Sequence, residues 1–185
     1  MIRIGIAHYQ FETIHPFLYG NGRIGRLLIT LFLVSKGILD KPLLYFSTFF
    51  EKNKTLYYDN LTRVREKNDL LQWLRYFLVG MDETARQAAQ TLSDVLKVKE
   101  HRESQLREKA GRRANTAMTL LHHLFQHPVI RIRDVEKTCS LSAKSANDLV
   151  AFFEYLGILR EFTGQTRYRV FVFNEYLDLF RQNEK

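Results

Sequence analysis

Apolar residues recur at helical spacing through the first part of the chain. The stretches with this pattern are residues 2–12, 23–35 and 55–65, followed by a long segment from Asp69 onward. Gly37 follows the second stretch at the position of a helix C-cap, where a left-handed residue ends a helix. The pattern therefore predicts that this part of the chain is entirely helical.

After Gly111 the pattern changes from long helices to short mixed elements. The predicted elements are, in order, helix 116–125, strand 129–132, helix 133–138, helix 142–156, strands 158–162 and 167–173, and helix 174–180. Ser142 is a good N-cap for the fourth element, and Gly157 stands just past its end. This order is typical of a winged helix-turn-helix with a small β-hairpin.

A run of charge separates the two patterns. Residues 97–113, KVKEHRESQLREKAGRR, contain seven basic and three acidic residues and three apolar ones. Such a run is typical of a solvated helix end or a linker. We therefore predict a mainly α protein with two domains, residues 1–110 and residues 111–185.

Composition narrows the class of protein. The 185 residues carry a formal net charge of +8, and 45% of them are hydrophobic, which is enough for a packed core and excludes a disordered chain. Cys139 is the one cysteine, so a disulfide scaffold and a zinc finger are both excluded. The longest apolar stretch, residues 27–34, is far shorter than the ~20 residues that span a bilayer. We expect a cytoplasmic protein with no membrane partner, and its basic charge suits phosphates or nucleic acid.

The segment HPFLYGNGRIGR, His15 to Arg26, lies between two predicted helices. Gly20, Asn21 and Gly22 form a run that tolerates positive φ, so successive backbone N–H groups can turn inward and bind an anion. The helix that follows directs its N-terminus, with free N–H groups and a positive dipole end, at the same place. The segment therefore predicts a binding site for a polyphosphate.

Side chains around this loop strengthen that prediction. Arg23 and Arg26 are three residues apart, so both lie on one helical face and can reach phosphate oxygens. His15 is one short loop away, where a neutral imidazole can take a proton from an attacking hydroxyl. A lone histidine or a GNG turn is usually structural, but their combination within twelve residues favours a functional site.

HPFLYGNGRIGR resembles the signature of Fic proteins, His-Pro-Phe-x-[Asp/Glu]-Gly-Asn-Gly-Arg-x-x-Arg, and departs from it at one fixed position. The flanking segments AHYQFETIHPF and LLITLFLVSKGIL are similar to those of bacterial Fic proteins that carry a winged helix. The resemblance implies a helical Fic core. It also implies transfer of AMP from ATP to a Ser, Thr or Tyr hydroxyl of a target protein.

The resemblance also implies roles for particular residues. His15 is expected to be the general base. The residues expected to hold the phosphates and the leaving pyrophosphate are Gly20, Asn21, Gly22, Arg23 and Arg26. Phe17 is expected to be a buried anchor of the loop. Tyr58 is expected either near the nucleobase or, as one of a tyrosine pair on a helix, in the core.

Tyr19 is the departure from the signature, because the family carries there an acidic residue that holds Mg²⁺. A neutral phenol is a poor ligand for this hard cation. The Mg²⁺ ion offsets charge that develops on the leaving phosphates. We therefore expect weak or absent transfer in this chain, although His15 is intact.

A second departure concerns the start of the chain. In the family, the β-hairpin flap that aligns the target and an inhibitory helix lie upstream of the motif, and this chain begins only fourteen residues before His15. We therefore expect an N-terminally truncated, partial Fic core. Apolar surface on residues 2–12 and 27–34 should then be exposed, or covered by a second copy of the chain in a homodimer.

In the second domain, helix 142–156 is the candidate recognition helix. The candidate DNA contacts are Lys144, Ser145, Asn147, Arg167 and Arg169. Asp148 and Glu154 on the same helix would repel phosphates, and winged helices also serve as protein contacts. Two functions therefore remain open: a protein AMP-transferase, or a degenerate nucleotide-binding module fused to a DNA-binding domain in a transcriptional regulator.

Overall fold

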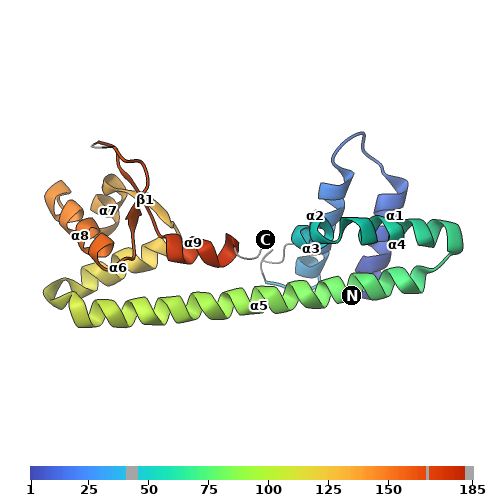
Figure 1. Cartoon of the computed structure of the whole chain (residues 1–185), viewed down its shortest axis with the longest axis horizontal. Helices are drawn as coiled ribbons and strands as arrows, with labels where there is room; N and C mark the ends of the chain where they lie inside the picture. The colour runs from blue at the N-terminus through green and yellow to red at the C-terminus, as the bar shows by residue number, and fades with distance from the viewer. Residues whose placement is uncertain (41–45, 166, 182–185) are drawn as a thin grey trace. The chain divides into compact units, whose positions relative to one another are not determined.

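The computed structural model describes residues 1–40, 46–165 and 167–181 (Figure 1). The chain divides into two compact units, Met1–Gln90 and Thr91–Lys185, which we call the N-terminal and the C-terminal unit. The prediction of a mainly α protein with a small antiparallel sheet is confirmed. None of the helices in the described residues combines the length and the apolar character that crossing a membrane requires.

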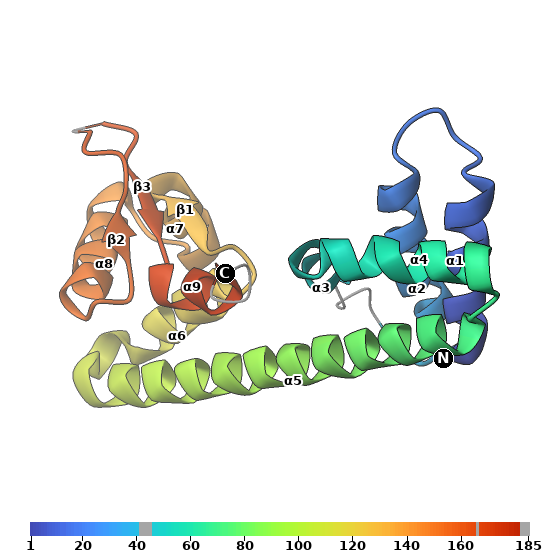
Figure 2. The same cartoon turned by 45° about the vertical axis from the view of Figure 1, so that its right-hand side comes forward.

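The N-terminal unit is helical throughout its described residues. Its helices are α1 (Ile2–Ile14), α2 (Asn21–Ser35), α3 (Ser47–Lys52), α4 (Lys54–Lys67) and the first part of α5 (Leu70–Lys109). The pattern predicted each of these except the short α3. Figures 1 and 2 show α1 and α2 side by side, joined by the loop that contains the first half of the motif.

Aromatic side chains fill the interior of the N-terminal unit. Trp73 is fully buried, and its indole N–H donates to the carbonyl of Gly5 across 2.8 Å. Tyr57 and Phe77 contact its ring, and Phe50 contacts both of them, with ring centroids of these pairs 4.9–6.5 Å apart. Aromatic pairs at these distances add to the free energy gained from burial. This interior joins α1, α3, α4 and α5.

A close approach of α1 and α2 depends on Gly25. A Cβ atom at this position would meet Oε1 of Glu12, Cε1 of His8 and Cδ1 of Phe11. The missing side chain lets the carboxyl group of Glu12 lie against the backbone of α2. The two helices are therefore held at a spacing that a larger residue at position 25 would not allow.

The C-terminal unit combines helices with a three-stranded sheet. After the last part of α5 come a 3₁₀ turn (Gly111–Arg113), α6 (Ala114–Leu124), β1 (Val129–Arg131), α7 (Ile132–Cys139), α8 (Ala143–Tyr155), β2 (Arg160–Glu161), β3 (Val170–Val172) and α9 (Asn174–Arg181). The order of helices and strands agrees with the predicted order. Its assignment as a winged helix stays a prediction.

The sheet places β3 between β1 and β2, and both pairings are antiparallel (Figure 2). Phe171 of β3 is opposite Ile130 and Glu161, and both Phe171 and Ile130 are buried in the core. The hydroxyl of Ser142 accepts from the N–H of Ser145 at 3.3 Å, and Gly157 has a φ of 67°. The predicted start and end signals of α8 are thus confirmed.

The charge run did not separate the two units where we expected. The helix α5 continues without a break through residues 97–109, and the compact units divide at Gln90, well before Gly111. The reason is that Leu106 is fully buried in the core of the C-terminal unit and Val98 packs against that core. Two apolar side chains therefore attach this charged helix to the second unit.

The predicted exposure of apolar residues on α1 and α2 is confirmed. Ile2, Leu27 and Leu31 each expose half of their surface or more. Ile4, Ile29 and Leu33 on the same helices are buried. Each helix therefore buries one apolar face and leaves further apolar side chains in solvent.

Candidate functional site

The loop between α1 and α2 begins and ends with a left-handed residue. His15 has φ 52° and ψ 56°, and its N–H donates to the carbonyl of Phe11, which ends α1. Gly20 has φ 84° and precedes the first turn of α2, where no side chain caps the free N–H groups. The loop thus brings His15 to the N-terminus of α2, as the motif predicted.

Asn21 holds this loop. Its side chain is only 2% exposed, its Oδ1 accepts from the N–H of Phe17 at 3.0 Å, and its Nδ2 donates to the carbonyl of Phe17. Since both polar groups of Asn21 bind the loop backbone, the side chain acts first on loop shape. Contact of position 21 with a phosphate would then come from its backbone N–H.

The expectation that Phe17 is a buried anchor is wrong. The side chain of Phe17 is 49% exposed, and its ring lies 6.3 Å from that of Phe11. The loop is fixed at this position by the backbone groups of Phe17, which Asn21 binds, and not by burial of the ring. Tyr19 is 89% exposed on the same loop.

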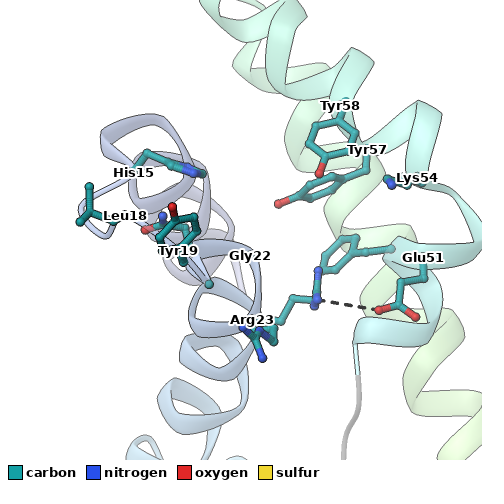
Figure 3. Close-up of a pocket in the computed structure, with 13 residues that line it drawn as sticks. His15, Leu18, Tyr19, Gly22, Arg23, Glu51, Lys54, Tyr57 and Tyr58 are labelled. Atoms are coloured by element: carbon teal, nitrogen blue, oxygen red, sulfur yellow. Dashed lines mark ion pairs between the residues drawn. The ribbon is translucent and has the colours of Figure 1, made fainter.

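A pocket of about 630 Å³ opens beside the loop. Its lining residues are His15, Leu18, Tyr19, Gly20, Asn21, Gly22, Arg23, Arg26, Phe50, Glu51, Lys54, Tyr57 and Tyr58. Figure 3 shows two walls, with His15 and Tyr19 on the side of the loop and Glu51, Lys54 and Tyr58 on the side of α3 and α4. All six residues predicted from the motif, and Tyr58, therefore meet at one pocket.

The charged side chains of the pocket are mainly basic. Arg23, Arg26 and Lys54 line it together with Glu51, which carries the one carboxylate among the described lining residues. An Nη2 atom of Arg26 lies 3.8 Å from Oε1 of Glu51, whereas its Nε is buried with no partner in the described part of the chain. The pocket thus offers an excess of positive charge to an anion.

His8 supports the pocket from beneath. It is fully buried, with Nδ1 3.0 Å from the carbonyl oxygen of Gly25 and Nε2 3.0 Å from the hydroxyl of Tyr57. A carbonyl only accepts, so Nδ1 carries the proton and the Tyr57 hydroxyl donates to Nε2. Burial lowers the pKa of His8 to about 4, and Arg26 contributes in the same direction. His8 is therefore neutral at physiological pH and joins α1, α2 and α4.

Glu12 is a buried carboxyl group beside the pocket. Its Oε1 has no hydrogen-bond partner among the described residues, although Nη2 of Arg65 donates to the backbone carbonyl of Glu12. Desolvation raises the pKa of this carboxyl, while electrostatic interaction with His15, Arg26 and Arg65 opposes the shift. Glu12 also lines a second hollow, together with His15 and Tyr58.

Two residues of the far wall, Glu51 and Lys54, were not predicted. Glu51 and Lys54 belong to α3 and to the start of α4, and no spacing signal in the chain connects them to the motif. Of the tyrosine pair, Tyr58 is exposed at the pocket, whereas Tyr57 is buried beneath it and bonded to His8. We gave two interpretations for Tyr58, a position near the nucleobase or in the core. Tyr58 lies at the pocket, and its neighbour Tyr57 is the tyrosine in the core.

In the C-terminal unit, three of the candidate DNA contacts are exposed and the other two bind each other. Lys144, Ser145 and Arg167 are exposed. Arg169 donates to Oδ1 of Asn147 across 2.8 Å, and its guanidinium lies 5.1 Å from the ring centre of Phe171. These last two side chains thus bind each other and tie α8 to the hairpin.

Comparison with known proteins covers the loop and both flanking helices. The model of the Fic/DOC family matches residues 1–33. A protein of Aquifex aeolicus (strain VF5), described as a probable protein adenylyltransferase, is 54% identical over 35 residues. That match covers 19% of this chain and 11% of the Aquifex protein.

The Fic/DOC match covers one wall of the pocket. His15, the glycine loop, Arg23 and Arg26 lie within residues 1–33, whereas Glu51, Lys54 and Tyr58 lie beyond them. The wall formed by residues 1–33 carries the residues that the motif predicted. The facing wall is described by the structure alone.

Proposed function

We propose that the N-terminal unit binds a nucleoside diphosphate or triphosphate and is part of a protein adenylyltransferase. Such an enzyme moves AMP from ATP to a Ser, Thr or Tyr hydroxyl of a target protein. The observation that carries the proposal is the pocket in which His15, the Gly20–Gly22 backbone, Arg23 and Arg26 meet. The Fic/DOC match and the name of the Aquifex relative support the type of reaction.

In the proposed reaction, His15 takes the proton of the attacking hydroxyl. The hydroxyl oxygen forms a bond to the α-phosphorus, and the bond from that phosphorus to the bridging oxygen breaks, so pyrophosphate leaves. Arg23 and Arg26 stabilise the charge on the leaving group, and backbone N–H groups of Gly20 and Gly22 bind phosphate oxygens. The N-terminus of α2 adds its positive dipole end.

The donor set of the pocket does not fit Mg²⁺. This cation prefers carboxylate and phosphate oxygens. Tyr19 offers a neutral phenol that is largely in solvent, and the carboxylate of Glu51 faces Arg26. No group of three or more His, Cys, Asp or Glu residues in the described ranges is placed to hold a metal ion. We therefore propose that this chain transfers AMP weakly or not at all, although it retains the base.

Incubation with α-labelled ATP tests the proposal. We expect little labelling by the natural chain and at least tenfold more by Tyr19→Asp, because an acidic residue restores the position that the family uses for its metal. Adding His15→Ala to Tyr19→Asp should abolish the label. Strong labelling by the natural chain that disappears in His15→Ala would contradict weak transfer. Labelling that persists in His15→Ala would contradict the role of the base.

We infer a second candidate function for the C-terminal unit, binding of DNA as a winged helix in a regulator. The observation that favours it is the exposure of two basic candidates, Lys144 on α8 and Arg167 before β3. Phosphate contacts should weaken binding steeply with added salt. Titration of a DNA duplex at several salt concentrations tests this, and absence of binding at low salt would contradict it.

A further inference from the structure

Lys54 is the basic side chain that the facing wall adds to the pocket. It is the first residue of α4, it is exposed, and it has no ion-pair partner within the described residues. In Figure 3 it lies across the pocket from His15, next to Tyr57. The side chain of the preceding residue, Asn53, donates to the carbonyl of Phe49 and does not cap α4. The start of this fourteen-residue helix therefore adds its positive dipole end to the charge of Lys54.

The pocket is thus basic on both walls. Arg23 and Arg26 contribute from α2, and Lys54 contributes from α4, against the one carboxylate of Glu51 among the described lining residues. The contact of Arg26 with Glu51 is long, at 3.8 Å, and Glu51 is largely in solvent. Exposed ion pairs of this kind contribute little free energy. A phosphate can therefore take the place of Glu51 on Arg26.

The same walls lack what a metal-bound polyphosphate needs. Mg²⁺ cancels two negative charges of a bound triphosphate, so a site that uses the metal supplies a carboxylate and fewer cations. Here the position of the family's acidic residue is Tyr19, and a third cation is present at Lys54. Both differences make the charge of the pocket more positive. A more positive pocket favours a polyphosphate whose charge is not reduced by a bound metal ion.

We propose that this pocket binds the polyphosphate of its nucleotide without Mg²⁺, with the ammonium group of Lys54 in place of the metal's charge. The inference rests on the proposed nucleotide binding and goes beyond it, because it concerns which form of the nucleotide is bound. Lys54 contacts the phosphates directly in this arrangement. Arg23, Arg26 and the backbone of the glycine loop bind from the other wall.

Calorimetric titration of the whole chain with ATP tests the proposal, in excess EDTA and in excess Mg²⁺ at one ionic strength. We expect an affinity in EDTA that equals or exceeds the affinity in Mg²⁺. Binding that weakens tenfold or more in EDTA would overturn the inference and leave the proposed nucleotide binding intact. Absence of binding under both conditions would instead overturn the proposed function.

Two charge-matched variants test the role of Lys54. Lys54→Gln should weaken ATP binding in EDTA about fivefold, because one charge-assisted contact to phosphate is lost at a partly exposed site. Lys67→Gln removes the same charge from the other end of α4, outside the pocket, and should bind ATP as the natural chain does. Equal affinities of the two variants in EDTA would overturn the assignment of Lys54.

Tyr19→Asp supplies the converse test. The new carboxylate adds a ligand for Mg²⁺ and reduces the positive charge of the pocket. We expect ATP to bind this variant more tightly in Mg²⁺ than in EDTA, which reverses the order expected for the natural chain. An unchanged order in Tyr19→Asp would contradict the proposal, provided that far-ultraviolet circular dichroism shows the variant to be folded.

Discussion

The two units bury different kinds of side chain. All buried polar or charged residues of the described chain lie in the N-terminal unit; they are His8, Glu12, Asn21, Thr30, Asn60 and Thr84. The core of the C-terminal unit, from Leu106 to Phe173, consists of apolar residues. Burial of a polar group costs free energy unless the group is bonded, and Glu12 and Arg26 each keep a buried polar atom without a partner in the described residues.

The two units therefore differ in how their interiors contribute to stability. The C-terminal unit gains stability from close packing of aliphatic and aromatic side chains, which requires no particular ligand. The N-terminal unit accepts buried polar groups, and three of them lie at or near the pocket: Asn21 lines it, His8 bonds Tyr57, and Glu12 lines a hollow with His15. Such departures from an apolar interior are typical of functional sites. The predictions below test this contrast, from the largest expected effect to the smallest.

Leu121→Ala should be the most damaging change, because Leu121 is fully buried in the apolar core of the C-terminal unit. We expect the free energy of unfolding to fall by about 2–5 kcal/mol, through lost burial and the cavity that remains. Leu96→Ala, at an exposed position of α5, is the matched control and should cost less than ~1 kcal/mol. Urea denaturation measures both, and equal losses would contradict a core based on packing.

His8 should make the N-terminal unit sensitive to acid. Its folded pKa of about 4 is below the ordinary value of 6.5, so its contribution to stability is present above pH 6.5 and is lost as the pH falls towards 4. The loss should be on the order of 3 kcal/mol over this window. Urea denaturation at several pH values measures it. His8→Gln should flatten this part of the profile, and an unchanged slope in the variant would contradict the prediction.

Asn21→Ala and Phe17→Ala compare a buried polar group with an exposed ring on one loop. Asn21→Ala leaves the N–H and carbonyl of Phe17 without their side-chain partner and should cost about 1–3 kcal/mol. Phe17→Ala should cost less than ~1 kcal/mol, since the ring is half in solvent. Thermal denaturation measures both variants. A larger loss in Phe17→Ala would restore the anchor role that the structure contradicts.

Glu12→Gln should give the smallest change, and its sign should depend on pH. Desolvation raises the folded pKa of Glu12, so its contribution to stability is present below the unfolded pKa and is lost as the pH rises through the folded pKa. The amide of Gln at position 12 does not ionise, so the variant does not lose this stability as the pH rises. The variant should therefore gain stability relative to the natural chain between pH 4 and pH 7, as measured by denaturation at both values. A relative loss over that range would contradict the raised pKa.

Much of the fold could be predicted because it depends on local patterns. The apolar periodicity gave α1, α2, α4 and the start of α5, and the caps at Ser142 and Gly157 marked both ends of α8. The segment His15–Arg26 was predicted as one site because its residues are neighbours in the chain. Glycines with a positive φ and a helix N-terminus are local properties as well.

The remaining features depend on contacts between distant segments. Glu51 and Lys54 reach the pocket because α3 and α4 pack opposite the loop, which no spacing in the chain encodes. The motif placed Asn21 at a phosphate, but its side chain is bonded to Phe17 once the loop has closed. The charge run suggested a boundary near Gly111, yet Val98 and Leu106 bind that part of α5 to the C-terminal core. The boundary between the two units is therefore set by where the few apolar side chains of this segment are buried, and not by its charge.

The chain has a single tryptophan, and Trp73 lies in the aromatic interior of the N-terminal unit, stacked on His8 at 6.0 Å. Its fluorescence therefore reports on that unit alone. The α-helical signal in circular dichroism comes from both units. Denaturation followed by both methods in the intact chain would separate the two unfolding steps without cutting the protein, and the natural sequence already contains the probe.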